Sequence, residues 1–167
     1  MAVTINGDTG VSRVQDNVIE QPDLKTGIAG TGPAFSAYQS SAQTISNVTF
    51  TKLLFQTEEF DTNNCFASST FTPNVAGYYQ ISGGLFSGAT GFLTILELRK
   101  NGAAYKRISG SPNPANSVFD QGSAVVYLNG TTDYAELFFY QNSGGNLTIP
   151  FALADLVYMQ GFMVRAA

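Results

Sequence analysis

The stretch GYYQISGGLFSGATGFLTILELRKNG, from Gly77 to Gly102, holds two runs of strand-forming residues and a tight-turn signal. The first run, GYYQISGGLF, is rich in aromatic and aliphatic residues. In the second run, alternate residues fall on one face of a strand: Phe92, Thr94, Leu96 and Leu98. Asn101-Gly102 then supplies the two positive φ values of a type I′ hairpin turn. The stretch therefore predicts β-strands joined by tight turns.

The same pattern continues on both sides of this stretch. Towards the N-terminus lie AFSAY, SNVTFTKLLFQT and an alternating CFASSTFT; towards the C-terminus lie AAYKRIS, SVFDQGSAVVYL, DYAELFFYQN and LVYMQGFMVRA. Segments rich in Gly, Pro and Asn, such as SPNPANS and SGGN, separate them. No segment has a convincing helical pattern. Eight to ten strands at this spacing predict an all-β protein, a β-sandwich or jelly roll.

Composition excludes several classes of function. The 167 residues suffice for one domain, and the formal net charge is -4. Lys and Arg never cluster beyond a pair, which argues against nucleic-acid binding through a basic face. The chain has no histidine, so Ser-His-Asp and Cys-His sites are impossible within it. No apolar run reaches the ~18 residues of a membrane span. We expect a non-enzymatic protein without cofactor, metal or membrane insertion.

The first 33 residues differ from the rest. All 13 Phe and all 8 Tyr lie from Phe35 onward. Residues 1–33 therefore cannot form their own core, and we predict an attachment arm or linker, with the domain at 34–167. The start of the chain lacks signal-peptide features, so synthesis in a cytoplasm is expected. The arm's apolar residues are Val3, Ile5, Val11, Val14, Val18, Ile19 and Leu24.

Five motifs in order resemble the C1q/tumour-necrosis-factor-like globular domain over about residues 34–165: AFSAY, FTPNVAGYYQIS, LELRKNGAAY, SAVVYLNGTTDYAELFFYQN and YMQGFMV. The resemblance implies a ten-stranded jelly-roll β-sandwich that forms an intimate homotrimer. The surplus of aromatic residues fits an interface. We expect structural roles, not ligand roles, for Gly77, Tyr78, Tyr79, Asn101, Gly102, Gly161 and Phe162. Met159-Gln160-Gly161 before Phe162 departs from the family pattern, and the calcium-binding acidic loops of some members are not evident.

The N-terminal MAVTINGDTGVSRVQDN is similar to the openings of bacteriophage fibre proteins. This implies a short trimeric tail fibre or receptor-binding protein of a virion, assembled in the host cytoplasm. The arm would mount on the baseplate or tail, and the head would meet a host cell-surface glycan or protein. The alternative is a trimeric capsid decoration protein, whose arm lies between capsid subunits. A secreted C1q-like ligand is disfavoured, because the chain has no collagen-like stalk.

Three polar connectors are candidates for host binding, because binding residues concentrate on loops. They are FSGATG (86–91), SPNPANS (111–117) and NSGGN (142–146). Exposed Tyr, Asn, Gln and Ser can recognise a glycan by stacking and hydrogen bonds, although ordinary connectors would have the same composition. The candidate residues are Phe86, Asn113, Asn116, Asn142 and Asn146.

Two further features concern single side chains. Glu58, Glu59 and Asp61 form the only local carboxylate group, in which alternation puts Glu59 and Asp61 on one face. Calcium needs six to eight oxygens, so a solvated loop is favoured there. Cys65 follows Asn63-Asn64 in a predicted turn, which indicates partial exposure. Its thiol is either unbridged or joined by an intermolecular disulfide to a different protein, because three symmetry-related thiols cannot all pair.

Overall fold

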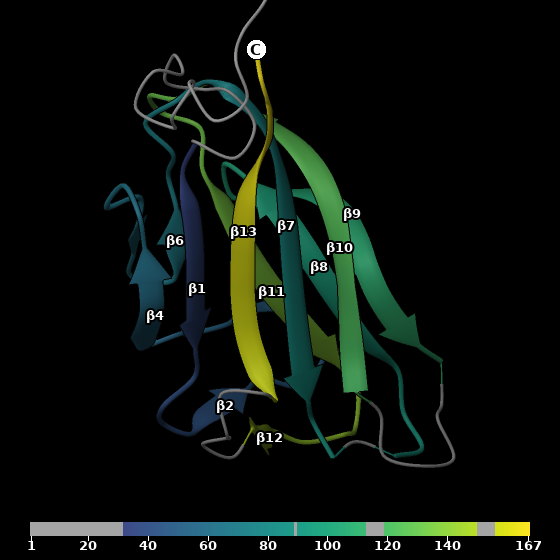
Figure 1. Ribbon diagram of the computed structural model, residues 1–167. Coiled ribbons are helices and arrows are strands. Elements are labelled where there is room, and N and C mark those ends of the chain that lie inside the picture. The colour runs from purple at the N-terminus through teal and green to yellow at the C-terminus, as the bar shows by residue number, and fades with distance from the viewer. Residues whose placement is uncertain (1–31, 89, 113–118, 150–155) are drawn as a thin grey trace, which may run out of the picture.

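The computed structural model describes residues 32–88, 90–112, 119–149 and 156–167. Within these residues the chain forms thirteen β-strands and no helix, and hence no helix able to cross a membrane (Figure 1). The arm residues up to 31, and the candidates Asn113 and Asn116, lie outside the described residues.

Five antiparallel strands form the sheet at the front of Figure 1. Their order across the sheet is β10 (Phe119–Leu128), β7 (Gly77–Phe86), β13 (Val157–Ala166), β1 (Ala34–Tyr38) and β4 (Thr57–Asp61). The first and last strands of the domain, β1 and β13, are therefore neighbours at its centre. The AFSAY and YMQGFMV segments, which open and close the domain in sequence, thus pair with each other in space.

A second sheet packs behind the first (Figure 1). Its order is β5 (Phe66–Ala67), β6 (Thr70–Phe71), β11 (Ala135–Gln141), β8 (Thr94–Lys100) and β9 (Ala103–Ser111), and β3 (Thr51–Lys52) also pairs with β11. A small sheet of β2 (Gln43–Ile45) and β12 (Leu147–Ile149) lies at one end. The result is a two-layer sandwich, as predicted.

An aromatic cluster joins the two layers. The ring of Phe35 in β1 stacks on Phe66 and Phe71 of the opposite sheet, at centroid distances of 4.7 and 4.5 Å. Phe71 also meets Tyr79 of β7 edge to face at 5.3 Å. All four rings are buried. Aromatic pairs of this kind contribute stability beyond the apolar area they remove from water.

The hairpin at the opening stretch has its predicted geometry. Asn101 and Gly102 have φ values of 53° and 75°, and β8 and β9 pair on either side of them. Thr94, Leu96 and Leu98 are fully buried on the inner face of β8, as the alternation predicted. Phe92 departs from that pattern, because β8 begins only at Thr94 and Phe92 is half-buried before it.

The CFASSTFT segment is not one strand. It forms the short hairpin of β5 and β6, with Ser68 and Ser69 both at positive φ (51° and 59°). The Oγ of Ser69 accepts a hydrogen bond from the backbone N–H of Phe55 at 2.7 Å and is buried, which offsets an unfavourable backbone conformation. Connections of two to five residues thus divide the region before β7 into more, shorter strands than predicted.

A register shift in β4 overturns the expected shared face of Glu59 and Asp61. The shift lies opposite Ser36 and Ala37 and breaks the two-residue alternation. The Glu59 carboxylate accepts a hydrogen bond from the Ser36 hydroxyl at 2.6 Å. Asp61 instead pairs with the inward Phe35, and its carboxylate accepts the N–H of Phe66 at 2.7 Å. Asp61 therefore anchors the following turn.

Candidate functional site

Exposed apolar side chains line the outer face of the five-stranded sheet. The ladder places Tyr78 beside Tyr127, and Gln80 between Val125 and Phe162. These side chains point away from the core formed by alternate residues such as Tyr79. We call the following set, each 40–51% exposed, the aromatic face: Phe60, Tyr78, Val125, Tyr127, Phe162 and Val164.

The aromatic face is nearly free of charge. Strands β7, β10 and β13 together contain two charged residues, Asp120 and Arg165, and Asp120 is fully buried on the inner side. A groove of about 670 Å³ runs between Tyr78, Tyr127 and the end of β13 at Arg165. The two tyrosine rings lie 5.4 Å apart. An uncharged apolar surface with aromatic side chains is typical of a protein interface.

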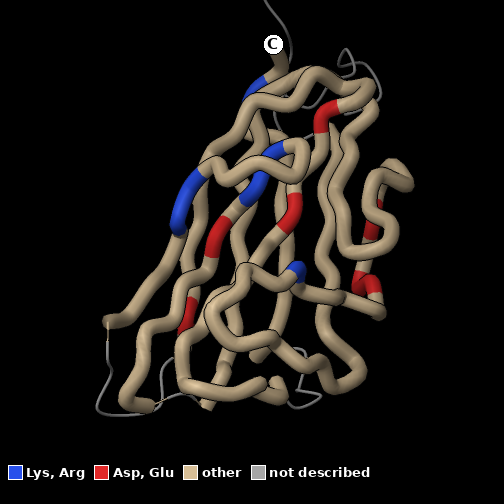
Figure 2. The backbone as a smooth tube through the Cα atoms, turned by 180° about the vertical axis from the view of Figure 1, so that it is seen from behind, with Lys and Arg blue, Asp and Glu red and all other residues tan. Residues whose placement is uncertain are grey.

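Charged residues gather instead on the opposite sheet, which faces the viewer in Figure 2. Lys52 and Glu136 form an ion pair at 2.7 Å, and Arg99 and Glu97 another at 2.9 Å. The Arg99 guanidinium also lies 4.0 Å from the centre of the Phe138 ring. Within these pairs the charges neutralise one another, so the carboxylates of Glu97 and Glu136 are not free, and Lys106 and Arg107 of β9 add exposed positive charge beside them. Among the described residues, no group of three or more Cys, Asp or Glu is placed to hold a metal.

The predicted binding loops converge at one end of the sandwich. A cleft of about 370 Å³ is lined by residues from or beside all three of them: Gly91, Phe92, Leu93, Pro112 and Asn142. Of the predicted candidates, the structure therefore places Asn142 in the cleft. Asn146 is exposed but does not line it, and Phe86 pairs with Phe119 in the β7–β10 ladder.

Sequence reasoning missed Phe92, Leu93 and Pro112 as cleft residues. The alternation predicts Phe92 on the core face of a strand, and the candidate loop 111–117 contains Pro112 but singles out Asn113 and Asn116. The available signal in the sequence was the glycine at position 91. In the structure its φ is 77°, a conformation that L side chains rarely adopt, and the loop ends there in a turn. That turn delays the strand by two residues and leaves Phe92 half-buried at the loop end.

Two hydrogen bonds hold the cleft together. The backbone N–H of Leu93 donates to Oδ1 of Asn142 at 2.8 Å, and the backbone N–H of Asn142 donates to the carbonyl of Leu93 at 3.3 Å. Because the Leu93 N–H can only donate, the atom facing it must be the amide oxygen. This fixes the orientation of the Asn142 side chain without a ligand.

The arm joins the domain at the opposite end. Gly32 lies against Met163, and the N–H of Met163 donates to the carbonyl of Pro33 at 3.2 Å. Met163 is near the C-terminal end of β13, marked at the top of Figure 1. The ten-residue β7 runs from this end, where Gly77 pairs with Ala166, towards the loop that leads to Gly91. The arm junction and the cleft are thus about 30 Å apart, one strand length.

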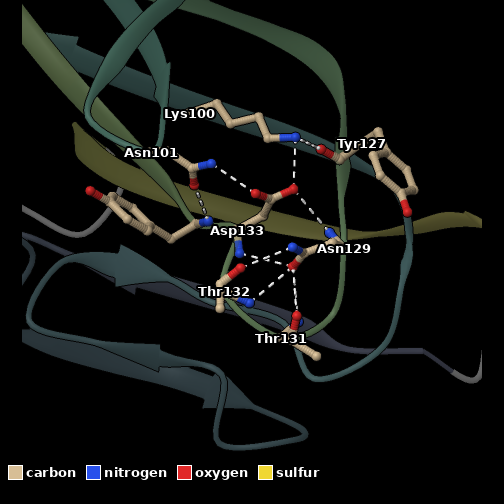
Figure 3. Close-up of polar contacts among 8 residues, drawn as sticks. Lys100, Asn101, Tyr127, Asn129, Thr131, Thr132 and Asp133 are labelled. Atoms are coloured by element: carbon tan, nitrogen blue, oxygen red, sulfur yellow. Dashed lines mark hydrogen bonds and ion pairs between the residues drawn. The ribbon is translucent and has the colours of Figure 1, made fainter.

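A polar network at the arm end joins two turns (Figure 3). The Asp133 carboxylate accepts hydrogen bonds from Asn101 Nδ2 at 2.7 Å and the backbone N–H of Asn129 at 3.2 Å, and it pairs with Lys100 at 2.8 Å. Asn129 Oδ1 in turn accepts the N–H groups of residues 131, 132 and 133. We call Lys100, Asn101, Asn129 and Asp133 the hairpin lock.

The hairpin lock favours the ionised form of Asp133. The hydrogen bond from Asn101 and the Lys100 ammonium hold the pKa of Asp133 below its ordinary value. Its donors are all within the protein, so the network serves to fix the turns. This agrees with the structural role expected for Asn101 and Gly102.

The expected partial exposure of Cys65 is wrong. The side chain is only 5% exposed and is part of the core, next to Phe66. Its thiol donates weakly to the carbonyl of Asn63 at 3.5 Å. Burial raises the pKa of Cys65, so the thiol remains protonated near neutral pH and is a poor nucleophile. An intermolecular disulfide stays a prediction and would require the turn at Asn63 to open.

Comparison with known proteins identifies the fold. No family model matches the sequence, and no curated protein matches it. The globular domain of zebrafish complement 1qA protein matches 81% of this chain and 99% of its own, with a TM-score of 0.57 and 17% identity. Murine APRIL matches 80% of this chain and 99% of its own (TM-score 0.61, 9% identity). The tumour-necrosis factor Eiger of S. frugiperda matches 86% and 96% (0.51, 8%).

These similarities establish the fold. The domain is a C1q/tumour-necrosis-factor-like jelly roll, which confirms the predicted fold class. At identities of 8–17% they carry no functional assignment. The fibre-type resemblance of the N-terminal segment stays a prediction.

Proposed function

We propose that this chain is a non-enzymatic structural protein of a bacteriophage virion, a short trimeric tail fibre or receptor-binding protein. Residues 1–33 mount it on the particle, and the C1q-like head meets the host cell surface. The observation that carries the proposal is the polarity of the domain. The arm junction at Gly32 and the cleft beside Asn142 lie at opposite ends of one rigid sandwich.

The aromatic face supports self-association as a homotrimer. Its six apolar side chains lie on the side of the sandwich, between the arm end and the cleft end. Packing three copies through this face would leave all arms at one end and all clefts at the other. Parallel clefts would increase avidity for a repetitive host surface.

A capsid decoration protein is the second candidate. The polarity argument applies equally, because a decoration protein also needs a mounting end and an outward end. Copy number separates the two proposals.

The test uses particles from cultures that produce this chain. An antibody raised against the purified protein is used for immunogold electron microscopy, and copies per particle are counted by mass spectrometry. Tail label and tens of copies are expected for the fibre; capsid label and hundreds would establish decoration. Absence of the chain from purified particles would overturn both. Unreduced samples in the same experiment show whether Cys65 is bridged to another virion protein.

A further inference from the structure

We propose that the cleft beside Asn142 is a subsite for one neutral pyranose ring of a surface glycan. The inference deepens the proposed attachment role and rests on it for biological meaning. It stands on three observations: the size of the cleft, the chemistry of its walls and the fixed orientation of its amide. The argument uses only lining residues from the described part of the chain.

The size of this open cleft suits a small ligand. Its volume of about 370 Å³ is at the lower end of the range for small-molecule sites. Such sites combine apolar walls with a few polar groups that fix orientation. Here Phe92, Leu93 and Pro112 supply apolar surface, and Asn142 supplies the polar group. The faces of a pyranose ring present C–H groups suited to an aromatic ring, and its edge presents hydroxyls.

The Asn142 amide is preorganised to bind a hydroxyl. Its Oδ1 is occupied by the N–H of Leu93, so its Nδ2 group is the end left for a ligand. Nδ2 has no acceptor among the described residues. A donor already held in place loses little conformational freedom on binding. Sugar hydroxyl and ring oxygens are acceptors of the required kind.

The charge of the cleft selects among sugars. None of the five described residues that line it is charged. A sialic acid or uronic acid would bring a carboxylate to a site with no cation to pair with it, and desolvating that charge would disfavour binding. A phosphorylated sugar meets the same obstacle. The ligand class is therefore a neutral hexose or N-acetylhexosamine.

Two substitutions test the site in the full-length chain. Asn142→Asp keeps an oxygen for the Leu93 N–H but removes the Nδ2 donor. Phe92→Leu keeps apolar volume but removes the aromatic ring. Asn146→Asp is the matched control, because it makes the same change of charge in the same loop without lining the cleft. Thermal melting establishes that each variant is folded.

The probes are methyl glycosides of glucose, galactose, mannose and N-acetylglucosamine, with N-acetylneuraminic acid as the anionic comparison. Saturation-transfer NMR is expected to show transfer to the ring protons of at least one neutral glycoside. Affinity should fall at least about fivefold in both Phe92→Leu and Asn142→Asp and stay unchanged in Asn146→Asp. Binding of none of the neutral glycosides, preference for the anionic sugar, or unchanged affinity in both cleft variants would overturn the subsite.

These results are independent of the particle experiment. A chain that is present on virions but binds no pyranoside would retain the proposed function and lose the subsite. A chain that binds a pyranoside through Phe92 and Asn142 but is absent from virions would retain the subsite and lose the phage assignment.

Discussion

Cys65 illustrates how one side chain takes its chemistry from its surroundings. The residue lies beside polar Asn63 and Asn64 in sequence, yet it is buried in the hydrophobic core that also contains Phe35 and Phe66. Burial disfavours the thiolate, which is the reactive form of cysteine. The raised pKa means that the thiol stays neutral as pH rises through its ordinary value of 9.0.

We therefore expect Cys65 to react slowly in the native protein. With a thiol-specific disulfide reagent at pH 8, modification should be at least about tenfold slower than in denaturant, because reaction requires local opening. Absorbance of the released thiolate measures the rate. Equal rates in native and unfolded protein would show that Cys65 is exposed, and would revive the intermolecular disulfide as a readily formed bond.

The buried hydroxyl of Thr94 lowers the stability of the folded protein. Its side chain is fully buried on the inner face of β8, and its hydroxyl has no hydrogen-bond partner among the described residues. Thr94→Val keeps the shape and removes the unsatisfied group. We expect it to stabilise the protein by about 1 kcal/mol, measured from the urea unfolding midpoint.

Thr70→Val is the matched control for this substitution. The Thr70 hydroxyl accepts a hydrogen bond from Lys52 at 2.6 Å and contacts Glu136 at 3.3 Å. Its loss should destabilise the protein by about 1 kcal/mol. The same sign for both substitutions would show that β-propensity, rather than hydrogen-bond satisfaction, decides the result.

Among the elements, the hairpin lock couples the β8–β9 turn to the β10–β11 turn. The native pKa of Asp133 lies below the ordinary 3.8, so the ionised carboxylate stabilises the fold. This contribution is fully present above about pH 3.8 and is lost as pH falls through the lower, native pKa. The hairpin lock therefore stabilises the fold at neutral pH.

Asp133→Ala should lower stability at pH 7 by about 2 kcal/mol, because it removes a charged acceptor and leaves Lys100 unpaired. The difference from wild type should shrink as the pH is lowered below 3.8. Urea unfolding at a series of pH values measures it. The exposed Glu58→Gln serves as control and should change little at any pH. A pH-independent effect of Asp133→Ala would mean that packing, and not charge, explains the loss.

For the whole molecule, the distribution of charge distinguishes the two sheets. Ion pairs lie on the outer face of the β11–β8–β9 layer (Figure 2). On the other layer, the aromatic face over β7, β10 and β13 has only Arg165 as an exposed charge, and Glu58 and Glu59 lie at its edge on β4. Burying exposed apolar surface of this kind in an interface between subunits lowers the free energy of the assembly. The homotrimer proposal follows from this asymmetry.

Phe162→Glu should therefore disrupt the assembly. Phe162 is 50% exposed at the centre of the aromatic face, and a buried carboxylate there would have no partner. Light scattering after size exclusion should give three times the 17.8 kDa chain mass for wild type and the monomer mass for Phe162→Glu. Val48→Glu is the control, because Val48 is 60% exposed but lies outside the sheet. A monomeric wild type, or a trimeric Phe162→Glu, would contradict the proposal.

Local patterns were sufficient for much of the fold. Alternation in GFLTILELRK identified the buried face of β8, and Asn101-Gly102 identified its turn, because both depend only on neighbouring residues. The Ser68-Ser69 turn could not be predicted from neighbouring residues, because a hydrogen bond to Phe55, distant in sequence, stabilises it. Only part of the candidate cleft could be predicted. The loop composition indicates Asn142 as a binding residue, whereas the alternation pattern assigns Phe92 to a strand.

Tyr78 and Tyr79 show which feature of a strand its own sequence cannot predict, namely which face is buried. The two-residue period of a strand is enough to predict that adjacent tyrosines point to opposite faces. Which of the two lies inside depends on contacts with residues far away in the chain. Tyr79 packs against Phe71 and donates its hydroxyl to the carbonyl of Val75 at 2.6 Å, whereas Tyr78 is 44% exposed on the aromatic face. With tyrosines at both positions, the alternation of side chains does not distinguish one face of the strand from the other. The opposite sheet, formed by residues distant in sequence, covers only one face, and the tyrosine on that face is buried.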